Sequence, residues 1–430
     1  MAAFRVWFAL AGLALCGPAL AQGGVDKADT AWMAVSTILV LLMTPALALF
    51  YAGMVRRQNV LSTMLHSFML MGIGSVVWLV LGFTLAFGKS NGWLGGTEYA
   101  LGQNLSPTAA YGSQTIPALL FFLFQMMFAV ITPALISGAI AERMKFGSYV
   151  TFVTLWLLLV YSPVAGWVWN PDGWLFKLGA LDFAGGTVVH LASGVAALAA
   201  SLALGRRRAL THGEPILPNN LTMTLLGAGL LWIGWIGFNA GSALAIDGIA
   251  MVAFTATQIG AAAGMLGWLI CEKVRTGKPT ALGAGSGLVA GLVGVTPAAG
   301  YVTASGGLAI GFLAGVACCI AVTWKNRLGY DDALDVVGVH GVGGALGALL
   351  TGVFASPLAN PVVNDALAKG RSSLILTQAI GVLSVGAYSF LLTVVILKVI
   401  GAVSGGLRAE AEAEDTGLDL ALHGESGYNL

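Results

Sequence analysis

Long apolar segments follow one another along almost the whole of this 430-residue chain and restrict its fold more than any other feature. Each is long enough to cross a hydrocarbon layer of about 30 Å as a helix of about 20 residues. Backbone polar groups in lipid must be paired within their own segment, so each span is expected to be an α-helix. We count eleven spans, approximately 30–55, 61–88, 117–141, 147–168, 185–204, 221–241, 250–271, 281–299, 305–324, 335–354 and 374–401.

Composition agrees with a membrane location. Charged residues make up 9% of the chain and hydrophobic residues 57%, whereas a soluble domain carries roughly 25% charged residues. The net charge of +1 gives no basic field for nucleic acid, which excludes nucleic-acid binding as the main role. Glycine recurs inside the apolar segments, as in helices that pack backbone to backbone. We therefore predict an all-α polytopic membrane protein.

The first 21 residues have the pattern of a secretory signal. A positive charge at Arg5 precedes an apolar run, and Ala19 and Ala21 form the small-x-small pattern that precedes a cleavage site. We predict a cleaved signal peptide over 1–21 and a mature chain that starts near Gln22. The alternative is an uncleaved extra helix.

The distribution of lysine and arginine predicts the orientation. Basic residues concentrate in cytoplasmic connections of membrane proteins. We therefore place the mature N-terminus outside and the C-terminus in the cytoplasm, with the protein in the cell inner membrane. The basic residues assigned to the inside are Arg56, Arg57, Arg143, Lys145, Arg206, Arg207, Arg208, Lys273, Arg275, Lys278, Lys325, Arg327, Lys398 and Arg408, and those assigned to the outside are Lys27, Lys89, Lys177, Lys369 and Arg371.

Residues 182–194 and 332–344 share one pattern: Asp, seven residues, His, three residues, Gly. These segments open the fifth and tenth spans, so they cross the membrane in opposite directions. Such an arrangement is typical of an inverted repeat, whose functional site lies at the repeat interface near the midplane. We predict a repeat of five helices plus five within a membrane domain over 22–404.

His190 and His340 occupy matching positions of this repeat, well inside apolar helices. An ionisable group inside a span is functional by default. If the rings face one another, an N–H of one could bond the bare nitrogen of the other. The alternatives are that each ring bonds a carbonyl, or that the pair ligates a metal or haem. No further ligand has suitable spacing, so we predict neither a metal nor a cofactor.

Asp182 and Asp332 precede their helices by a few residues. A carboxylate there caps free N–H groups and meets the positive end of the helix dipole. Asp182 lies on the outside, where a contribution to cation attraction stays open.

Aromatic residues gather at the outer ends of several spans. Trp167, Trp169 and Trp174 cluster at the outer end of the fourth span, where they could form an interfacial belt or offer a π face to a small cation. The same two interpretations apply to Phe124 and Phe128. Phenylalanines here are either ordinary packing or a plug in a narrow pore.

Several motifs together resemble bacterial ammonium transporters of the Amt/MEP/Rh family. The resemblance covers essentially all of residues 25–430. The motifs are Asp26-Lys-Ala-Asp29, Gly138-Ala-Ile-Ala-Glu-Arg143, Asp182-Phe-Ala-Gly-Gly-Thr-Val-Val-His190, Gly234-Trp-Ile-Gly-Phe-Asn-Ala-Gly-Ser242, Gly291-Leu-Val-Gly-Val-Thr-Pro297 and Gly338-Val-His340-Gly.

The resemblance implies an outer recruitment site for ammonium formed by Trp169, Phe128 and Ser242. It also makes Asp182 the family aspartate that supports this site. The segment 170–181 departs from the family pattern by being longer, which bears on the placement of Trp169.

Below that site the resemblance implies a pore. Phe128 and Phe238 would stack as its gate, His190 and His340 would be its twin histidines, and Trp235 would line it. Family members are homotrimers with one pore per subunit.

The tail over 405–430 is acidic. Family tails receive a cytoplasmic PII-type signal protein, and the segment Gly417-Leu-Asp419 resembles the ordered regulatory tail of the family. The plain alternative is a solvated acidic end.

These observations predict transport of ammonium across a lipid bilayer. The cation would be held outside and deprotonated, and ammonia would pass through an apolar pore lined by the two histidines. Potassium has no proton to lose and would be refused. One rival is an ammonium sensor, although only a short tail follows Gly405. The other, an intramembrane enzyme, lacks a nucleophile paired with a base, so we predict no enzymatic activity.

Overall fold

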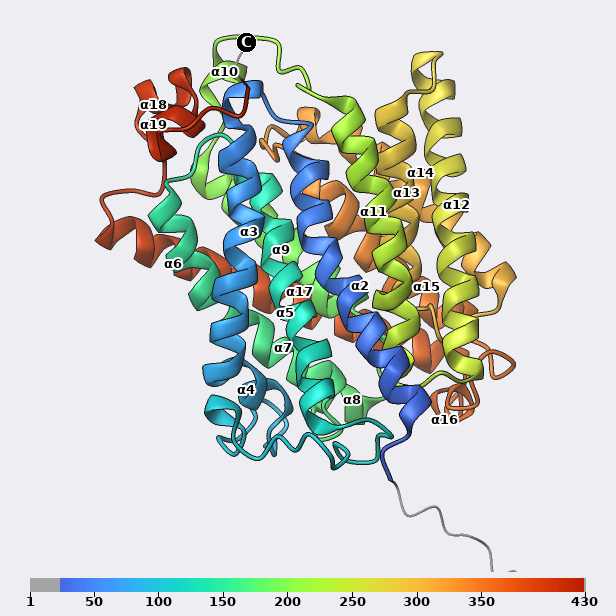
Figure 1. Ribbon diagram of the computed structural model, residues 1–430. Coiled ribbons are helices and arrows are strands. Elements are labelled where there is room, and N and C mark those ends of the chain that lie inside the picture. The colour runs from blue at the N-terminus through green and yellow to red at the C-terminus, as the bar shows by residue number, and fades with distance from the viewer. Residues whose placement is uncertain (1–23, 429–430) are drawn as a thin grey trace, which may run out of the picture.

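The computed structural model describes residues 24–428, and the predicted signal peptide at 1–21 lies outside them. Regular structure in the described residues is helical apart from two isolated bridges, Ala110 with Pro117 and Met144 with Arg408. Ten helices of this part of the chain are long and apolar enough to cross a membrane. The prediction of an all-α polytopic membrane protein is confirmed (Figure 1).

Some of the long helical segments are continuous and others join several elements. They are α2 (Lys27–Ala52), α3 (Val60–Val77) with η2 (Trp78–Gly82) and α4 (Phe83–Phe87), α5 (Ala118–Ile140), α6 (Phe146–Trp156) with η4 (Leu157–Tyr161), α7 (Ser162–Trp169) and α8 (Trp174–Leu178), η5 (Gly186–Leu191) with α9 (Ala192–Leu204), α11 (Leu221–Ala240), α12 (Gly248–Thr276), α14 (Ala304–Leu328), η7 (Val337–Gly341) with α15 (Val342–Phe354), and α17 (Arg371–Val403). The shorter elements include α10 (Arg208–Thr211), α13 (Ala281–Val295), α16 (Val363–Ala366), α18 (Ala411–Thr416) and α19 (Leu418–His423).

The eighth predicted span, 281–299, is not among these ten and corresponds to the shorter helix α13. Its 15 residues rise only about 22 Å, less than the hydrocarbon core of about 30 Å. α13 packs against α11, α12, α14 and α15, and every residue from Gly287 to Val295 is buried. Protein therefore surrounds most of this helix, which reduces the need for it to span the hydrocarbon layer.

Local sequence signals explain where several helices begin and end. The side chains of Asp26, Asp247 and Thr280 cap α2, α12 and α13 by accepting from N–H groups three residues later, each at 2.9 Å. α12 and α14 end at Gly277 and Gly329, whose φ angles of 82° and 79° lie in the left-handed region. Glycine reaches that region without a Cβ penalty, so it terminates both helices.

Close backbone contact joins α12, α13 and α14. A Cβ placed on Gly291 would lie 2.3 Å from the Gly260 carbonyl oxygen, and one on Gly315 would lie 2.1 Å from that of Gly264. Larger residues cannot occupy these positions without separating the helices. The glycine content therefore serves tight helix packing, as the sequence indicated.

Four of the described elements, η2, η4, η5 and η7, are π-helical turns inside longer helices. A π turn contains hydrogen bonds from residue i to i−5 and often lies at a functional site. In η5 the His190 N–H donates to the Gly185 carbonyl oxygen at 3.0 Å. Both predicted pore histidines lie in such turns, His190 in η5 and His340 in η7.

The two ends of the described chain lie at opposite ends of the helix bundle (Figure 1). α2 begins beside the loop that precedes α5, where the Asp26 N–H donates to the Thr115 carbonyl oxygen at 2.7 Å. The acidic tail folds against the other end, where the Asp419 carboxylate accepts from the backbone N–H of Ser62 at 2.7 Å. The tail is thus packed on the bundle at the first turn of α3.

Candidate functional site

The two histidines of the predicted repeat, His190 and His340, meet inside the bundle. Nδ1 of His190 and Nδ1 of His340 lie 3.2 Å apart, and the rings are nearly parallel with centroids 5.2 Å apart. Their exposed fractions are 1% and 4%. The sequence prediction that these two side chains face one another agrees with this geometry. One ring nitrogen must donate and the other accept, so the contact is a single hydrogen bond shared by the two rings.

Glycines allow the two broken helices to cross at the histidines. A Cβ on Gly194 would lie 2.2 Å from the backbone nitrogen of Gly341, and one on Gly344 would lie 2.8 Å from that of Leu191. Each glycine is four residues after one histidine and touches the residue that follows the other. The repeated spacing from His to Gly therefore fixes how closely the rings approach.

Asp182 holds the start of η5. Its carboxylate, 6% exposed, accepts from the N–H groups of Gly185, Gly186, Thr187 and Val188 at 2.9, 2.6, 2.8 and 3.2 Å, and from the Thr187 hydroxyl. Burial raises the pKa of Asp182, and the hydrogen bonds from Thr187, Gly186 and Val188 oppose that rise. The structure places this carboxylate in a capping role, with its oxygens directed at the helix.

Asp332 has the corresponding place before η7 with fewer bonds. Its Oδ2 accepts from the Val337 N–H at 2.7 Å, while Oδ1 has no partner among the described residues. Burial raises the pKa of Asp332 to about 6 against the opposing charge of Lys325. The capping role that the sequence analysis gives to Asp332 agrees with this contact.

Aromatic rings form a stack above the histidines. The Trp235 and Phe238 rings lie nearly parallel to the His190 ring, with centroids 5.4 and 6.0 Å from it. The Phe238 ring in turn contacts the Phe128 ring, with centroids 4.3 Å apart. The indole N–H of Trp235 donates to the Thr296 hydroxyl at 2.9 Å, which fixes its plane. The two phenylalanines predicted as a gate are therefore in contact, and Phe238 lies between Phe128 and the His190 ring.

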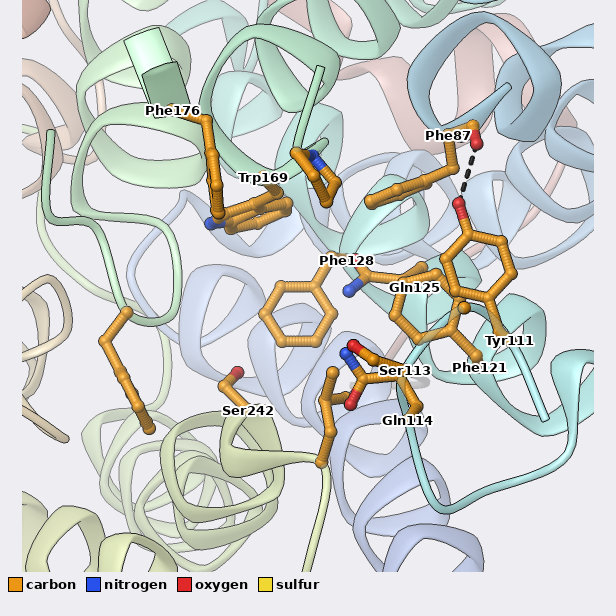
Figure 2. Close-up of a pocket in the computed structure, with 14 residues that line it drawn as sticks. Phe87, Tyr111, Ser113, Gln114, Phe121, Gln125, Phe128, Trp169, Phe176 and Ser242 are labelled. Carbon is orange, nitrogen blue, oxygen red and sulfur yellow. Dashed lines mark hydrogen bonds between the residues drawn. The ribbon is translucent and has the colours of Figure 1, made fainter. Parts of the chain in front are cut away.

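A cavity of about 330 Å³ lies on the far side of Phe128 (Figure 2). It is called the outer cavity because it lies at the end of the bundle that the sequence predicts to be outside. Its lining includes the three residues predicted to recruit the cation, Phe128, Trp169 and Ser242. The Trp169 and Phe128 rings meet edge to face at 5.8 Å, and the Trp169 indole N–H donates to the Asp182 carbonyl oxygen at 2.9 Å. Trp169 lies in this cavity even though the following segment is longer than expected.

Smaller cavities continue the path beyond the phenylalanines. One of about 10 Å³, room for about one water molecule, is lined by Trp235, Phe238 and both histidines together with apolar side chains. A second, also about 10 Å³, lies between His340 and Asp335. Asp335 then borders an open cavity of about 590 Å³ at the end of the bundle where the tail docks. The histidine pair thus lies between two wider, more polar mouths.

Comparison with known proteins identifies the arrangement. Residues 31–428 match the model of the Ammonium Transporter Family. The chain is 49% identical over 405 residues to an ammonium transporter of Bacillus subtilis, covering 94% of this chain and 99% of that protein. It is 47% identical over 443 residues to one of Mycobacterium tuberculosis, covering 95% and 92%. The chain belongs to the ammonium transporter family.

Solved structures agree with this membership of the ammonium transporter family. The crystal structure of Saccharomyces cerevisiae Mep2 superposes with a TM-score of 0.82 at 35% identity and covers 90% of each chain. A structure described as a sensor Amt protein superposes with a TM-score of 0.85 at 30% identity and covers 92% of this chain and 98% of that one. The protein is thus a multi-pass membrane protein of a transporter family and not an enzyme, as the sequence predicted.

Several residues of the transporter's path were not singled out from the sequence. Thr296 orients Trp235, and Gln125 lines the outer cavity beside Phe128. Asp335 has a left-handed φ of 65°, unusual for a residue with a side chain, and borders the cavity below His340. A polar residue between apolar neighbours in a span, such as Gln125, was the available signal for this group. Among the described residues no cluster of three or more potential ligands could hold a metal ion.

Proposed function

We propose that this protein captures ammonium at the outer cavity, removes a proton and passes ammonia between the histidines to the opposite mouth. The observation that carries the proposal is the His190–His340 contact, buried in a narrow apolar passage and closed on the outer side by Phe128 and Phe238. Neutral imidazoles offer a lone pair and an N–H to ammonia without requiring a fixed charge.

Charge explains why the passage is narrow and apolar. A cation at the centre of a bilayer costs from about 3 to well over 10 kcal/mol, whereas ammonia carries no charge. Potassium resembles ammonium in size and charge but cannot lose a proton. A passage that admits only the neutral molecule therefore provides flux and selectivity together.

The outer residues have complementary tasks in this proposal. Phe128 and Trp169 present π faces to the cation. The Ser242 hydroxyl donates its proton to the Phe238 carbonyl oxygen at 2.7 Å, which leaves its lone pairs available to the substrate. Asp182 positions Trp169 and η5 through its carbonyl and carboxylate oxygens.

Eleven crossings and a 5+5 inverted repeat form part of the proposal. Asp26 and the docked tail lie at opposite ends of the bundle, which requires an odd number of crossings and supports counting α13 with the ten longer helices. The reciprocal contacts of Gly194 and Gly344 support the repeat. The basic connections place the tail in the cytoplasm and the N-terminus outside the cell inner membrane, with 1–21 as a cleaved signal.

Assembly and regulation follow from membership of the family. We infer a homotrimer and a tail, 405–430, that receives a cytoplasmic PII-type protein. Support comes from the tail's position, because Asp415 pairs with Arg208 at 3.0 Å and the Arg56 guanidinium donates to the Glu414 carbonyl oxygen at 3.4 Å. A partner that binds the tail could therefore change the position of the helices that the tail contacts.

Transport in reconstituted liposomes tests the mechanism. We expect ammonium-dependent current or uptake with the wild-type protein and none with potassium. His190→Ala and His340→Ala should abolish or alter transport while the protein stays folded, and the exposed His212 supplies the control H212A, which should resemble wild type. Normal flux and selectivity in the folded double alanine variant would remove the histidines from the mechanism.

Sensing is a second candidate, favoured by the similarity to the sensor Amt structure. A sensor without transport would bind ammonium at the outer cavity yet give no flux in the same liposomes. That result would replace the transport proposal.

A further inference from the structure

The motif Asp26-Lys-Ala-Asp29 opens α2 near the outer cavity, and the mechanism above does not use it. Asp26 caps the helix by accepting from the Asp29 N–H at 2.9 Å. Asp29 lies in the first turn of α2. Its carboxylate bonds two segments that are distant from it in the chain. The motif therefore connects α2 to other parts of the bundle as well as starting the helix.

Each oxygen of the Asp29 carboxylate accepts a hydrogen bond from a different loop. Oδ2 accepts from the Thr115 hydroxyl, and Oδ1 accepts from the Ile246 backbone N–H at 2.8 Å. The Thr115 carbonyl oxygen also accepts from the Asp26 N–H at 2.7 Å. Asp29 thus joins the loop between α4 and α5 to the loop between α11 and α12.

Both loops border the outer cavity next to the residues that Asp29 holds. Residues 111–114 line the cavity and directly precede Thr115. Ser242 and Leu244 also line it, four and two residues before Ile246. The two oxygens of one carboxylate are therefore attached to two parts of the cavity wall.

We infer that Asp29 is a positioning residue of the outer cavity, which keeps residues 111–114 and Ser242 at the separation that capture of ammonium requires. The inference rests on the proposed function and deepens it. Figure 2 shows Gln114 and Ser242 across the Phe128 ring from Trp169. If the wall that carries Ser242 moved, its hydroxyl and the aromatic rings could no longer contact one ion together.

The expected effect follows from the mobility of loops. Connecting segments move more than the helices that they join unless contacts hold them. Without Asp29, the cavity wall would have the binding arrangement for only part of the time. The apparent affinity for a ligand falls in proportion to the fraction of molecules in the competent arrangement. Loss of the link should therefore weaken capture without changing the later steps of transport.

Electrostatic attraction of the cation by the Asp29 carboxylate is the competing explanation, because a negative charge near the mouth concentrates cations there. Asparagine distinguishes the two, since it has nearly the same shape and no charge. Its amide oxygen can accept from the Ile246 N–H, and its NH₂ group can donate to the Thr115 hydroxyl, which then acts as the acceptor. Asp29→Asn therefore keeps both links and removes the charge.

Currents in reconstituted liposomes test the inference. Asp29→Ala breaks both links, and we expect it to raise the half-saturation, the ammonium concentration for half-maximal current, about 3- to 10-fold with the maximal current preserved. The half-saturation of Asp29→Asn should stay within about twofold of wild type. Asp365→Ala is the matched control, since it removes an exposed carboxylate from α16 at the same end of the bundle (Figure 1). It should leave both quantities unchanged.

Thr115→Val breaks the side-chain link to one loop only, so it tests the inference even if Asp29→Ala does not fold. We expect its half-saturation to rise about 2- to 5-fold. The double variant should not exceed Asp29→Ala, because both changes break the same contact.

Four results would overturn the assignment. An unchanged half-saturation in D29A or in T115V would show that the link is not needed. Equal weakening in D29A and D29N would show that the charge acts and the position does not. Additive effects of D29A and T115V would show that the two residues act separately. Lower maximal current without a change in half-saturation would assign Asp29 to a later step. A wild-type protein that gives no ammonium-dependent current would instead overturn the proposed function itself.

Discussion

Replacing Asp182 should destabilise the folded protein before it affects substrate capture. The Asp182 carboxylate accepts four backbone N–H groups and one hydroxyl at the start of η5. In Asp182→Ala all five donors lose their acceptor inside the protein. An unsatisfied buried donor costs about 1 to 3 kcal/mol. Even if water reaches some of them, we expect a loss of about 3 to 5 kcal/mol, a large part of the 5 to 15 kcal/mol that stabilises a typical protein.

The stability of the Asp182→Asn variant should lie between that of the wild type and that of Asp182→Ala. Its remaining oxygen can serve Gly185 and Gly186, whereas its NH₂ group faces the donors of Thr187 and Val188. Losing those two bonds and the charge at the helix N-terminus predicts a cost of about 2 to 3 kcal/mol. Both variants should also lower transport, because the turn that they loosen carries His190.

Unfolding by denaturing detergent in mixed micelles measures these losses, with transport assayed on the same preparations. Asp172→Ala is the control, since this more exposed carboxylate near the same end pairs with Lys177 at 3.4 Å, a contact worth about 0 to 1 kcal/mol. If D182A and D182N unfold at the wild-type midpoint and only raise the ammonium concentration for half-maximal flux, Asp182 binds the cation and the capping explanation is wrong.

Three further predictions concern the outer site, the tail and pH. Trp169→Leu removes a π face worth roughly 0.5 to 2 kcal/mol, so half-saturation should rise about 2- to 30-fold in current measurements; no change would leave Trp169 as interfacial packing. Deleting 406–430 should preserve assembly but reduce or deregulate flux and abolish capture of a PII-type protein in pull-downs; unchanged binding and regulation would make the tail inert. Burial acts to raise the pKa of Asp331, but hydrogen bonds and charges from Arg207 and Arg143 outweigh it and lower the pKa. The unfolding midpoint should therefore stay constant above about pH 4 and decrease below it. An unfolding midpoint that does not change down to about pH 3 would contradict this ion-pair contribution.

The sequence was sufficient to predict most of the spans and the facing histidines. Hydrophobicity locates a span because lipid leaves the backbone few alternatives to a helix. A spacing repeated in two segments of opposite direction implies that matching residues meet, and His190 and His340 do. These inferences use regularities that extend over many residues.

Features that depend on single contacts could not be predicted. Nothing in residues 186–191 marks a π turn, although the turn begins at N–H groups bonded to the Asp182 carboxylate and leads into the crossing at Gly341. The Asp419 carboxylate accepts backbone N–H groups of α3, a contact that the acidic composition of the tail does not indicate. Glu142 bridges Arg56 and Arg207 from a backbone with φ of 70°, a partnership of residues far apart in the chain.

Because His190 and His340 lie in π turns, the direction of their side chains depends on how many residues each turn contains as well as on which residues these are. Each α-helical residue turns the chain by about 100°, and a π turn accommodates one residue more than an α turn. Removing one residue from Gly186–Leu191 would let the helix close with α bonds and rotate its two halves by that angle. Such a deletion would turn the histidine away from its partner even though every side chain of the pathway is kept. A point mutation does not change the number of residues in the turn, so it cannot produce this rotation. Among natural variants, insertions and deletions within these two short turns should accordingly be far rarer than substitutions, even substitutions of their apolar residues.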